Sequence, residues 1–182
     1  MNILKTEIAG LLIFEPRVFR DERGWFMESF NQKVFDEAVG EHYSFVQDNH
    51  SFSTQGVLRG MHYQLPPFAQ GKLVRVVQGK VWDVAVDIRK TSPTFGCSFC
   101  LELSAENQRQ FWVPPGFAHG FFTLSKTAEF LYKTTAFYNK SSERNILWND
   151  PDLKIDWPEI GVDPVLAEKD AHAPLLKFSD TF

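Results

Sequence analysis

Between about residues 45 and 140 the chain alternates apolar and polar side chains with a period of two, the pattern of short β-strands. Turn-forming segments containing glycine, proline and asparagine interrupt the pattern, and no amphipathic helix separates the strands, as a βαβ fold would require. The strands are expected at residues 73–77, 81–89, 99–103, 110–113, 120–124 and 129–135. This pattern predicts an all-β fold, an antiparallel sandwich or barrel, with a jelly roll as the favoured form.

The segments on either side of this region have different patterns. Asn31 is a suitable cap for a short N-terminal helix, which has one apolar stripe and ends at Gly40. After residue 141 the chain is irregular and carries Trp148, Trp157 and several prolines, which indicates a C-terminal extension packed over the barrel. We therefore expect one domain, residues 1–182, with its core at about residues 45–140.

The strand at residues 81–89 has two different faces. The even-numbered positions from Trp82 to Ile88 are apolar, whereas the odd-numbered positions include Asp83, Asp87 and Arg89. The alternation predicts that the even face is buried and the odd face is wetter.

Composition and charge exclude several classes of protein. The 182 residues are 43% hydrophobic, enough for one dry core, and the net charge is −4. No run of lysine or arginine provides the basic patch that nucleic-acid binding needs. The longest apolar stretch near the start, residues 8–14, is too short to span a membrane and lacks a basic leader. We therefore expect a cytoplasmic protein that binds neither nucleic acid nor membrane.

The only two cysteines, Cys97 and Cys100, form a C-x-x-C motif. Such a pair is found in redox sites and in half of a zinc site. However, no second pair completes a zinc site, and a strand would direct the two sulfurs to opposite faces. We assign the pair no function.

Two segments place unusual polar residues inside apolar strands. His62 shares the parity of Leu58 and Gln64, so it should face the barrel interior, either as a hydrogen-bonded core residue or as a catalytic group. Arg59 would point the other way unless Gly60 forms a bulge. Lys72 has the parity of buried valines, which indicates either a lysine extended to the strand end or an ammonium held in a cavity.

A third segment, Pro114 to Gly120, has the spacing P-x-G-x-x-H, one half of the cupin pattern, and delivers His119 to the interior. Metal-binding cupins also need an earlier H-x-H motif followed by glutamate. This chain has only His62-x-Gln64 there, and no glutamate at the right distance. Two imidazoles are too few for a tight transition-metal site, so we expect a cupin-like barrel without metal.

Eight segments together resemble the dTDP-4-dehydrorhamnose 3,5-epimerase family, in the same order and almost end to end. They are GWFMES (24–29), FVQDNHS (45–51), VLRGMHYQ (57–64), GKLVR (71–75), VAVDIR (84–89), WVPPGFAHG (112–120), AEFLYK (128–133) and ILWNDP (146–151). The resemblance implies inversion of C3 and C5 of dTDP-4-dehydro-6-deoxy-D-glucose, beside the C4 ketone, with neither metal nor nucleotide cofactor. Such inversion needs a base, a group that stabilises the enolate oxygen, and an acid.

By the same resemblance, His62 is the base, Asp170 orients it, Lys72 is the cation near the developing oxyanion, and Tyr132 donates the proton at C5. The resemblance also implies a set of residues that bind the dTDP-sugar, with Tyr138 stacking on thymine. They are Arg23, Phe26, Glu28, Gln47, Asn49, Arg59, Lys72, His119, Tyr138, Glu143 and Lys169. It further implies a homodimer with exchanged N-terminal strands.

Three other functions stay open at this point. A relative could invert only one centre or isomerise the ketone of a related sugar nucleotide. A non-catalytic sugar-nucleotide-binding cupin and a metal cupin are the other two.

Overall fold

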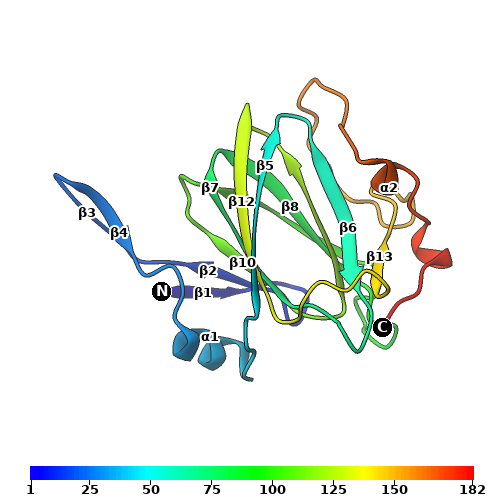
Figure 1. Ribbon diagram of the computed structural model, residues 1–182, viewed down its shortest axis with the longest axis horizontal. Coiled ribbons are helices and arrows are strands. Elements are labelled where there is room, and N and C mark those ends of the chain that lie inside the picture. The colour runs from blue at the N-terminus through cyan, green and yellow to red at the C-terminus, as the bar shows by residue number, and fades with distance from the viewer.

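The computed structural model describes residues 1–182 and consists mostly of β-strands arranged in two facing sheets (Figure 1). The six-stranded sheet has the order β1-β2-β10-β7-β12-β5, and the five-stranded sheet has the order β13-β6-β11-β8-β9. The strands of the two sheets are β1 (Asn2–Lys5), β2 (Leu12–Glu15), β5 (Gln47–Thr54), β6 (Leu58–Gln64), β7 (Lys72–Gln78), β8 (Lys80–Asp87), β9 (Ser98–Ser104), β10 (Gln110–Val113), β11 (Phe117–Thr123), β12 (Thr127–Thr134) and β13 (Glu143–Asn145).

The main hydrophobic core lies between the two sheets. It contains fourteen buried residues, among them Val74 and Phe130 from one sheet and Val81 and Phe121 from the other. The predicted all-β jelly roll and its six central strands are confirmed. The sheets keep free edge strands, so they form an open sandwich rather than a closed barrel.

The helix α1 (Gln32–Val39) begins and ends where the sequence predicts. The Asn31 side chain accepts a hydrogen bond from the Val34 amide, and Gly40 ends the helix with φ 85°. Phe35 is buried and packs edge-on against Trp112, with ring centroids 4.9 Å apart. The helix therefore covers the outer face of the six-stranded sheet at its β2 and β10 end.

A two-stranded hairpin, β3 (Val18–Asp21) and β4 (Gly24–Met27), stands away from the sandwich (Figure 1). It belongs to neither large sheet, and three of its aromatic side chains are at least half exposed: Phe19 (50%), Trp25 (55%) and Phe26 (69%). Such an apolar, solvent-exposed hairpin is typical of a segment that packs against a partner.

The C-terminal extension covers the outer face of the five-stranded sheet, as the sequence predicts. Ile146 and Leu153 pack against Val84 and Val86 of β8 in a second core cluster. The extension also contains α2 (Glu168–Ala171) and a 3₁₀ turn, η1 (Leu176–Phe178), on the same side of the molecule (Figure 1). The apolar outer-face residues of β8 and the extension residues that contact them are thereby removed from water.

This extension overturns the prediction that the odd-numbered face of β8 is wetter. Asp83 and Asp87 are both fully buried, as are Val81 and Ala85 on the same face. The apolar even face packs under the extension, and the odd face points into the space between the sheets. Both faces of β8 are dry because residues distant in sequence cover the outer one.

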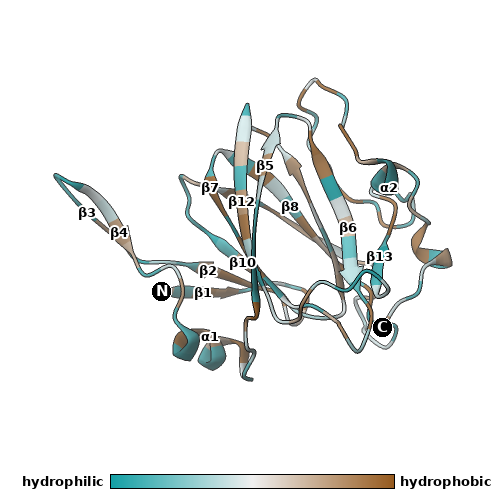
Figure 2. Cartoon of the chain, in the orientation of Figure 1, coloured by the Kyte–Doolittle hydropathy of each residue, from teal (hydrophilic) through white to brown (hydrophobic).

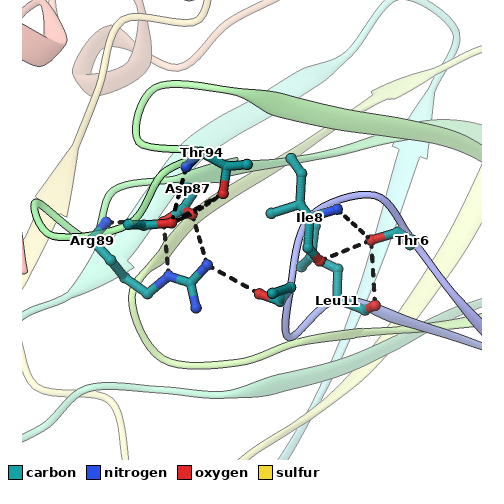
Figure 3. Close-up of polar contacts among 8 residues, drawn as sticks. Thr6, Ile8, Leu11, Asp87, Arg89 and Thr94 are labelled. Carbon is teal, nitrogen blue, oxygen red and sulfur yellow. Dashed lines mark hydrogen bonds and ion pairs between the residues drawn. The ribbon is translucent and has the colours of Figure 1, made fainter.

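Asp87 organises the end of β8 through several hydrogen bonds (Figure 3). Its carboxylate accepts hydrogen bonds from Arg89, Ser92 and Thr94, and these outweigh burial to lower its pKa to about 2. Arg89 Nη2 also donates to the Ala9 carbonyl at 3.0 Å. The cluster thus ties the loop after β8 to the N-terminal turn between β1 and β2.

Hydrophilic positions interrupt several otherwise hydrophobic strands, and β6 shows this clearly (Figure 2). The strands that these hydrophilic positions interrupt are therefore candidates for an active site.

No helix of the structure is long and apolar enough to cross a membrane.

Candidate active site

A cavity of about 440 Å³ opens between the two sheets. Its walls come from both sheets and from the C-terminal extension, with ten hydrophobic residues among the twenty that line it. It brings together nine of the residues named from the sequence: Arg59, His62, Lys72, His119, Tyr132, Tyr138, Glu143, Lys169 and Asp170. A concave, half-apolar site with a few convergent polar groups is typical of ligand binding.

A bulge at Gly60 lets β6 present Arg59 and His62 to the same cavity. Arg59 is aligned with Phe121 and His62 with His119, so β6 uses one residue more than β11 over this stretch. Gly60 has φ 145°, and a Cβ there would lie 2.6 Å from the Gly120 Cα. The bulge expected from the sequence is therefore present, and only glycine fits at its centre.

His62 forms a close pair with Asp170 from α2. The His62 Nε2 lies 2.6 Å from Asp170 Oδ1, and the Asp170 side chain is 2% exposed. Burial lowers the pKa of His62, and Lys72 lowers it further, although Asp170 opposes both effects. An ionised carboxylate only accepts hydrogen bonds, so Nε2 carries the proton and the other ring nitrogen is left as a base.

Lys72 projects from the start of β7 into the cavity. Its Nζ donates a hydrogen bond to the His62 carbonyl oxygen at 3.3 Å, and the residue is 8% exposed. Burial lowers the pKa of Lys72 to about 8, while the charges of Asp83 and Glu143 limit the shift. The ammonium form is therefore present at neutral pH and lies in a place of low dielectric.

Tyr132 faces the cavity from β12, in the sheet opposite to His62. Burial raises the pKa of its phenol, although the charges of Arg59 and Lys169 act in the other direction. The hydroxyl consequently keeps its proton at neutral pH and can act as a donor.

His119 is held by a buried carboxylate that the sequence analysis did not identify as a site residue. Its Nε2 lies 2.9 Å and 3.1 Å from the two Asp83 carboxylate oxygens. The sequence does contain a sign of this burial, because Val81 and Ala85, the neighbours of Asp83 on the odd-numbered face of β8, are apolar. Apolar neighbours on its own face place Asp83 inside the sandwich.

Several polar side chains at the mouth of the cavity are linked by hydrogen bonds. Tyr138 donates its hydroxyl to Glu143 at 3.0 Å, and Lys169 Nζ lies 2.6 Å from the other oxygen of Glu143. Gln47 accepts from the Tyr138 amide at 3.1 Å and donates to Asn49 at 2.9 Å. Gln47 and Asn49 therefore extend this polar rim along β5, although neither lines the cavity itself.

Three residues named from the sequence lie elsewhere in this chain. Arg23 and Phe26 are on the β3–β4 hairpin, Glu28 follows it, and none of them lines the cavity (Figure 1). The Arg23 side chain is 90% exposed and pairs with Asp21. Within a single chain they are not part of the site.

The chain matches the family model described as dTDP-4-dehydrorhamnose 3,5-epimerase over residues 5–177. It is also 63% identical to the dTDP-4-dehydrorhamnose 3,5-epimerase of Shigella flexneri, over 100% of this chain and 99% of the relative. The chain belongs to the dTDP-4-dehydrorhamnose 3,5-epimerase family.

Solved structures of related epimerases have the same architecture. One is the dTDP-6-deoxy-D-glucose-3,5-epimerase of Legionella pneumophila in complex with dTDP-4-keto-L-rhamnose, which is 54% identical to this chain. The two structures superpose with a TM-score of 0.95 over 98% of this chain and 94% of the Legionella chain. A 3'-monoepimerase of Streptomyces bikiniensis, in complex with dTDP-quinovose, is 34% identical with a TM-score of 0.89 over 94% of this chain and 86% of its own. The solved structures that resemble this chain thus include a 3,5-epimerase and a 3'-monoepimerase.

The epimerase cavity has no group of three or more histidine, cysteine, aspartate or glutamate side chains that could hold a metal, and neither has any other part of the chain. Cys97 and Cys100 are free, and neither lines the cavity. The polar side chains of the cavity include two imidazoles, two ammonium groups, three phenols, a guanidinium and the carboxylates of Glu143 and Asp170.

Proposed function

We propose that this protein inverts C3 and C5 of dTDP-4-dehydro-6-deoxy-D-glucose and produces dTDP-4-dehydro-L-rhamnose. The observation that carries the proposal is that His62 and Tyr132 line one cavity from opposite sheets. Lys72 lines the same cavity from the sheet that contains Tyr132. Inversion removes a proton from one side of a carbon and returns one to the other side. A base and an acid on facing sheets are suited to that task.

The residues divide the work as follows. The free ring nitrogen of His62 takes the proton beside the ketone, and the imidazolium that forms is stabilised by Asp170 at 2.6 Å. Electron density moves to the C4 oxygen, where the Lys72 ammonium stabilises the enolate. Tyr132 returns a proton to C5 from the opposite face. His62 then releases its proton to water and the Tyr132 phenolate takes one up from water, so the enzyme regains its first state.

The magnitudes show what these groups can supply. A positioned acid or base gives about 10²–10⁴-fold, and one oxyanion donor gives about 10²–10³-fold. Together they reach roughly 10⁴–10⁷-fold, the lower edge of the range for enzymes. Binding of the nucleotide part must contribute the rest by orienting the sugar.

We propose that the cavity mouth binds the nucleotide part. Tyr138 is 55% exposed, which leaves its ring face available for thymine. Arg59 is anchored by bonds from Nε to Ser53 and from Nη2 to the Phe52 carbonyl, and its planar guanidinium suits a diphosphate. Gln47, Asn49, His119, Glu143 and Lys169 complete the proposed contacts within this chain.

Incubation of the protein with the 4-keto sugar nucleotide in D₂O tests this function. Deuterium should enter C3 and C5, as measured by NMR, and the product should have the L-rhamnose configuration. His62→Ala and Lys72→Ala should each lose at least about a hundredfold in turnover. A folded wild-type protein that exchanges neither proton would refute the proposal.

Tyr132→Phe tests the division of labour. It removes only the proposed acid, so exchange at C3 should persist better than inversion at C5. Equal loss at the two carbons would contradict this assignment.

Inversion of only one centre is the second candidate, and the likeness to the Streptomyces bikiniensis 3'-monoepimerase favours testing it. The product distinguishes the two functions, because a monoepimerase incorporates deuterium with inversion at a single carbon. NMR coupling constants of the sugar ring report each configuration separately.

We further propose that the protein acts as a homodimer in which N-terminal strands are exchanged. The β3–β4 hairpin, which stands away from the sandwich (Figure 1), supports this, because it exposes Phe26 and Arg23, and neither lines the chain's own cavity. An exchanged hairpin would bring Arg23, Phe26 and Glu28 to the partner's cavity, where Arg23 would add a cation for the diphosphate.

A mixed dimer tests the exchange. Arg23→Ala and His62→Ala chains should each form weakly active homodimers. In their heterodimer, an exchanged hairpin leaves one site with both residues intact, so about half of the wild-type activity should return. If each hairpin serves its own chain, no activity returns.

We also propose a cytoplasmic location. Both cysteines are free thiols, which suits a reducing compartment. Fractionation of the producing cells, with the protein detected by antibody, checks this proposal.

A further inference from the structure

Asp83 is a buried carboxylate that the proposed mechanism does not use. It lies in the middle of β8 with no solvent exposure, between Val81 and Ala85 on the interior face. A carboxylate in such a place costs free energy unless it is paired, and a hydrophobic residue would stabilise the fold at least as well. Its presence therefore calls for a role in the site.

Asp83 acts on two cavity groups, on His119 by direct contact and on Lys72 by its charge. Both carboxylate oxygens face His119 Nε2, at 2.9 Å and 3.1 Å. The same negative charge acts on the Lys72 ammonium and favours its charged form. His119 and Lys72 line the cavity, whereas Asp83 itself does not.

We infer that Asp83 is a positioning residue, which fixes the His119 imidazole for the substrate. The inference rests on the proposed epimerase activity. Because an ionised carboxylate only accepts hydrogen bonds, the proton of His119 stays on Nε2. The other ring nitrogen is then left free to accept a hydrogen bond from a sugar hydroxyl in the cavity.

The negative charge of Asp83 also favours the charged form of Lys72. The two carboxylates that favour its ammonium form differ, because Glu143 is already paired with Lys169 at 2.6 Å. Asp83 is bonded only to an imidazole. The titratable and charged groups that line the cavity with Lys72 are Arg59, His62 and Tyr63 on β6, His119 on β11, Tyr132 on β12, Tyr138, Glu143 on β13, and Lys169 and Asp170 on α2. Asp83 on β8 lies behind His119, outside the lining.

Asp87 provides a matched control for a purely structural carboxylate. It lies on the same face of the same strand, has the same zero exposure, and is also fully hydrogen-bonded. Its partners hold a loop, and neither Asp87 nor Arg89 lines the cavity. Loss of either carboxylate should destabilise the fold, but only loss of Asp83 should alter catalysis.

The test is the pH dependence of kcat/KM for Asp83→Asn and Asp87→Asn, compared with the wild type. Asp83→Asn should shift the alkaline fall in rate to lower pH and reduce the rate on the plateau at least about tenfold. Asp87→Asn should leave the profile unchanged. In a His119→Asn background, Asp83→Asn should cause no further loss on the plateau, because the residue through which it acts is gone.

NMR of protein labelled with ¹³C-lysine follows the titration of Lys72 without turnover, and Asp83→Asn should move it to lower pH. If Asp83→Asn does not fold, Asp83→Glu keeps the charge and should lower the plateau while leaving the alkaline fall in place. Wild-type protein without turnover would refute the proposed function. An active wild type with an unchanged profile and Lys72 titration in Asp83→Asn would overturn this inference instead.

Discussion

The ionisation of Lys72 should set the alkaline limit of activity. Burial lowers its pKa to about 8, and the ammonium is the proposed stabiliser of the enolate oxygen. A lysine is charged below its pKa, so the rate should hold at neutral pH and fall as pH rises through about 8. At pH 9 about a tenth of the molecules keep the charge, so kcat/KM should fall about tenfold from its plateau.

Two substitutions should change the alkaline fall in rate, and the structure predicts the direction of each change. Lys72→Met removes the ammonium but fills the same space, so the rate should drop about 10²–10³-fold and the residual activity should lack the fall near pH 8. Lys169 lowers the pKa of Lys72 by charge repulsion. Lys169→Met should therefore move the alkaline fall to higher pH, whatever it does to substrate affinity.

The assay is the initial rate of C3 deuterium exchange between pH 6 and 10, at substrate concentrations well below KM. Circular dichroism at each pH confirms that the protein stays folded. If Lys72→Met keeps a fall near pH 8, another group sets the limit. If Lys169→Met shifts the fall to lower pH, charge repulsion by Lys169 does not set the pKa of Lys72.

Three further predictions concern the His62–Asp170 pair, the Gly60 bulge and the stability of the fold at acid pH. Asp170→Asn removes the charge that supports the His62 imidazolium, so steady-state kinetics should show a fall in turnover of about 10²–10⁴-fold. Gly60→Ala places a Cβ 2.6 Å from the Gly120 Cα, and denaturant titration should show a loss of about 1–3 kcal/mol together with lost activity. The pKa of Asp87 is lowered to about 2 from 3.8, so its stabilising contribution is present above pH 4 and is lost as pH falls towards 2. The wild type should lose about 2 kcal/mol of unfolding free energy over that interval, and Asp87→Asn should lack this component of the pH dependence.

Local patterns were sufficient for much of the fold because the information lay in neighbouring residues. Asn31 and Gly40 define the helix ends by hydrogen bonding and φ, and period-two alternation defines the central strands. The parity of His62 and Lys72 correctly placed both side chains at the cavity. The glycine inside β6 left a bulge at Gly60 as one of two alternatives, and the register shift between β6 and β11 decides in its favour.

Other features depend on contacts between distant parts of the chain. The odd face of β8 looked wet because nothing near it in sequence shows that residues such as Ile146 and Leu153 bury the opposite face. The apolar neighbours Val81 and Ala85 could have placed Asp83 inside the sandwich, but its partner His119 lies 36 positions away and could not be inferred from them. The pairing of Asp170 with His62 spans 108 positions, and only the family resemblance pointed to it.

The C-terminal extension links folding to chemistry. Its apolar residues cover the outer face of the five-stranded sheet, and its end is held by Arg144, which bonds to Asp180, and by the Phe182 amide, which donates to the Ile88 carbonyl. Asp170 lies on the segment between these attachments and reaches the opposite, interior side of β6 to meet His62. Because Asp170 also accepts the Gly60 amide at 3.3 Å, the carboxylate is aimed by the bulge as well as by the extension. Loss of extension packing should therefore impair the base before it unfolds the sandwich, whose main core lies on the other side of the sheet.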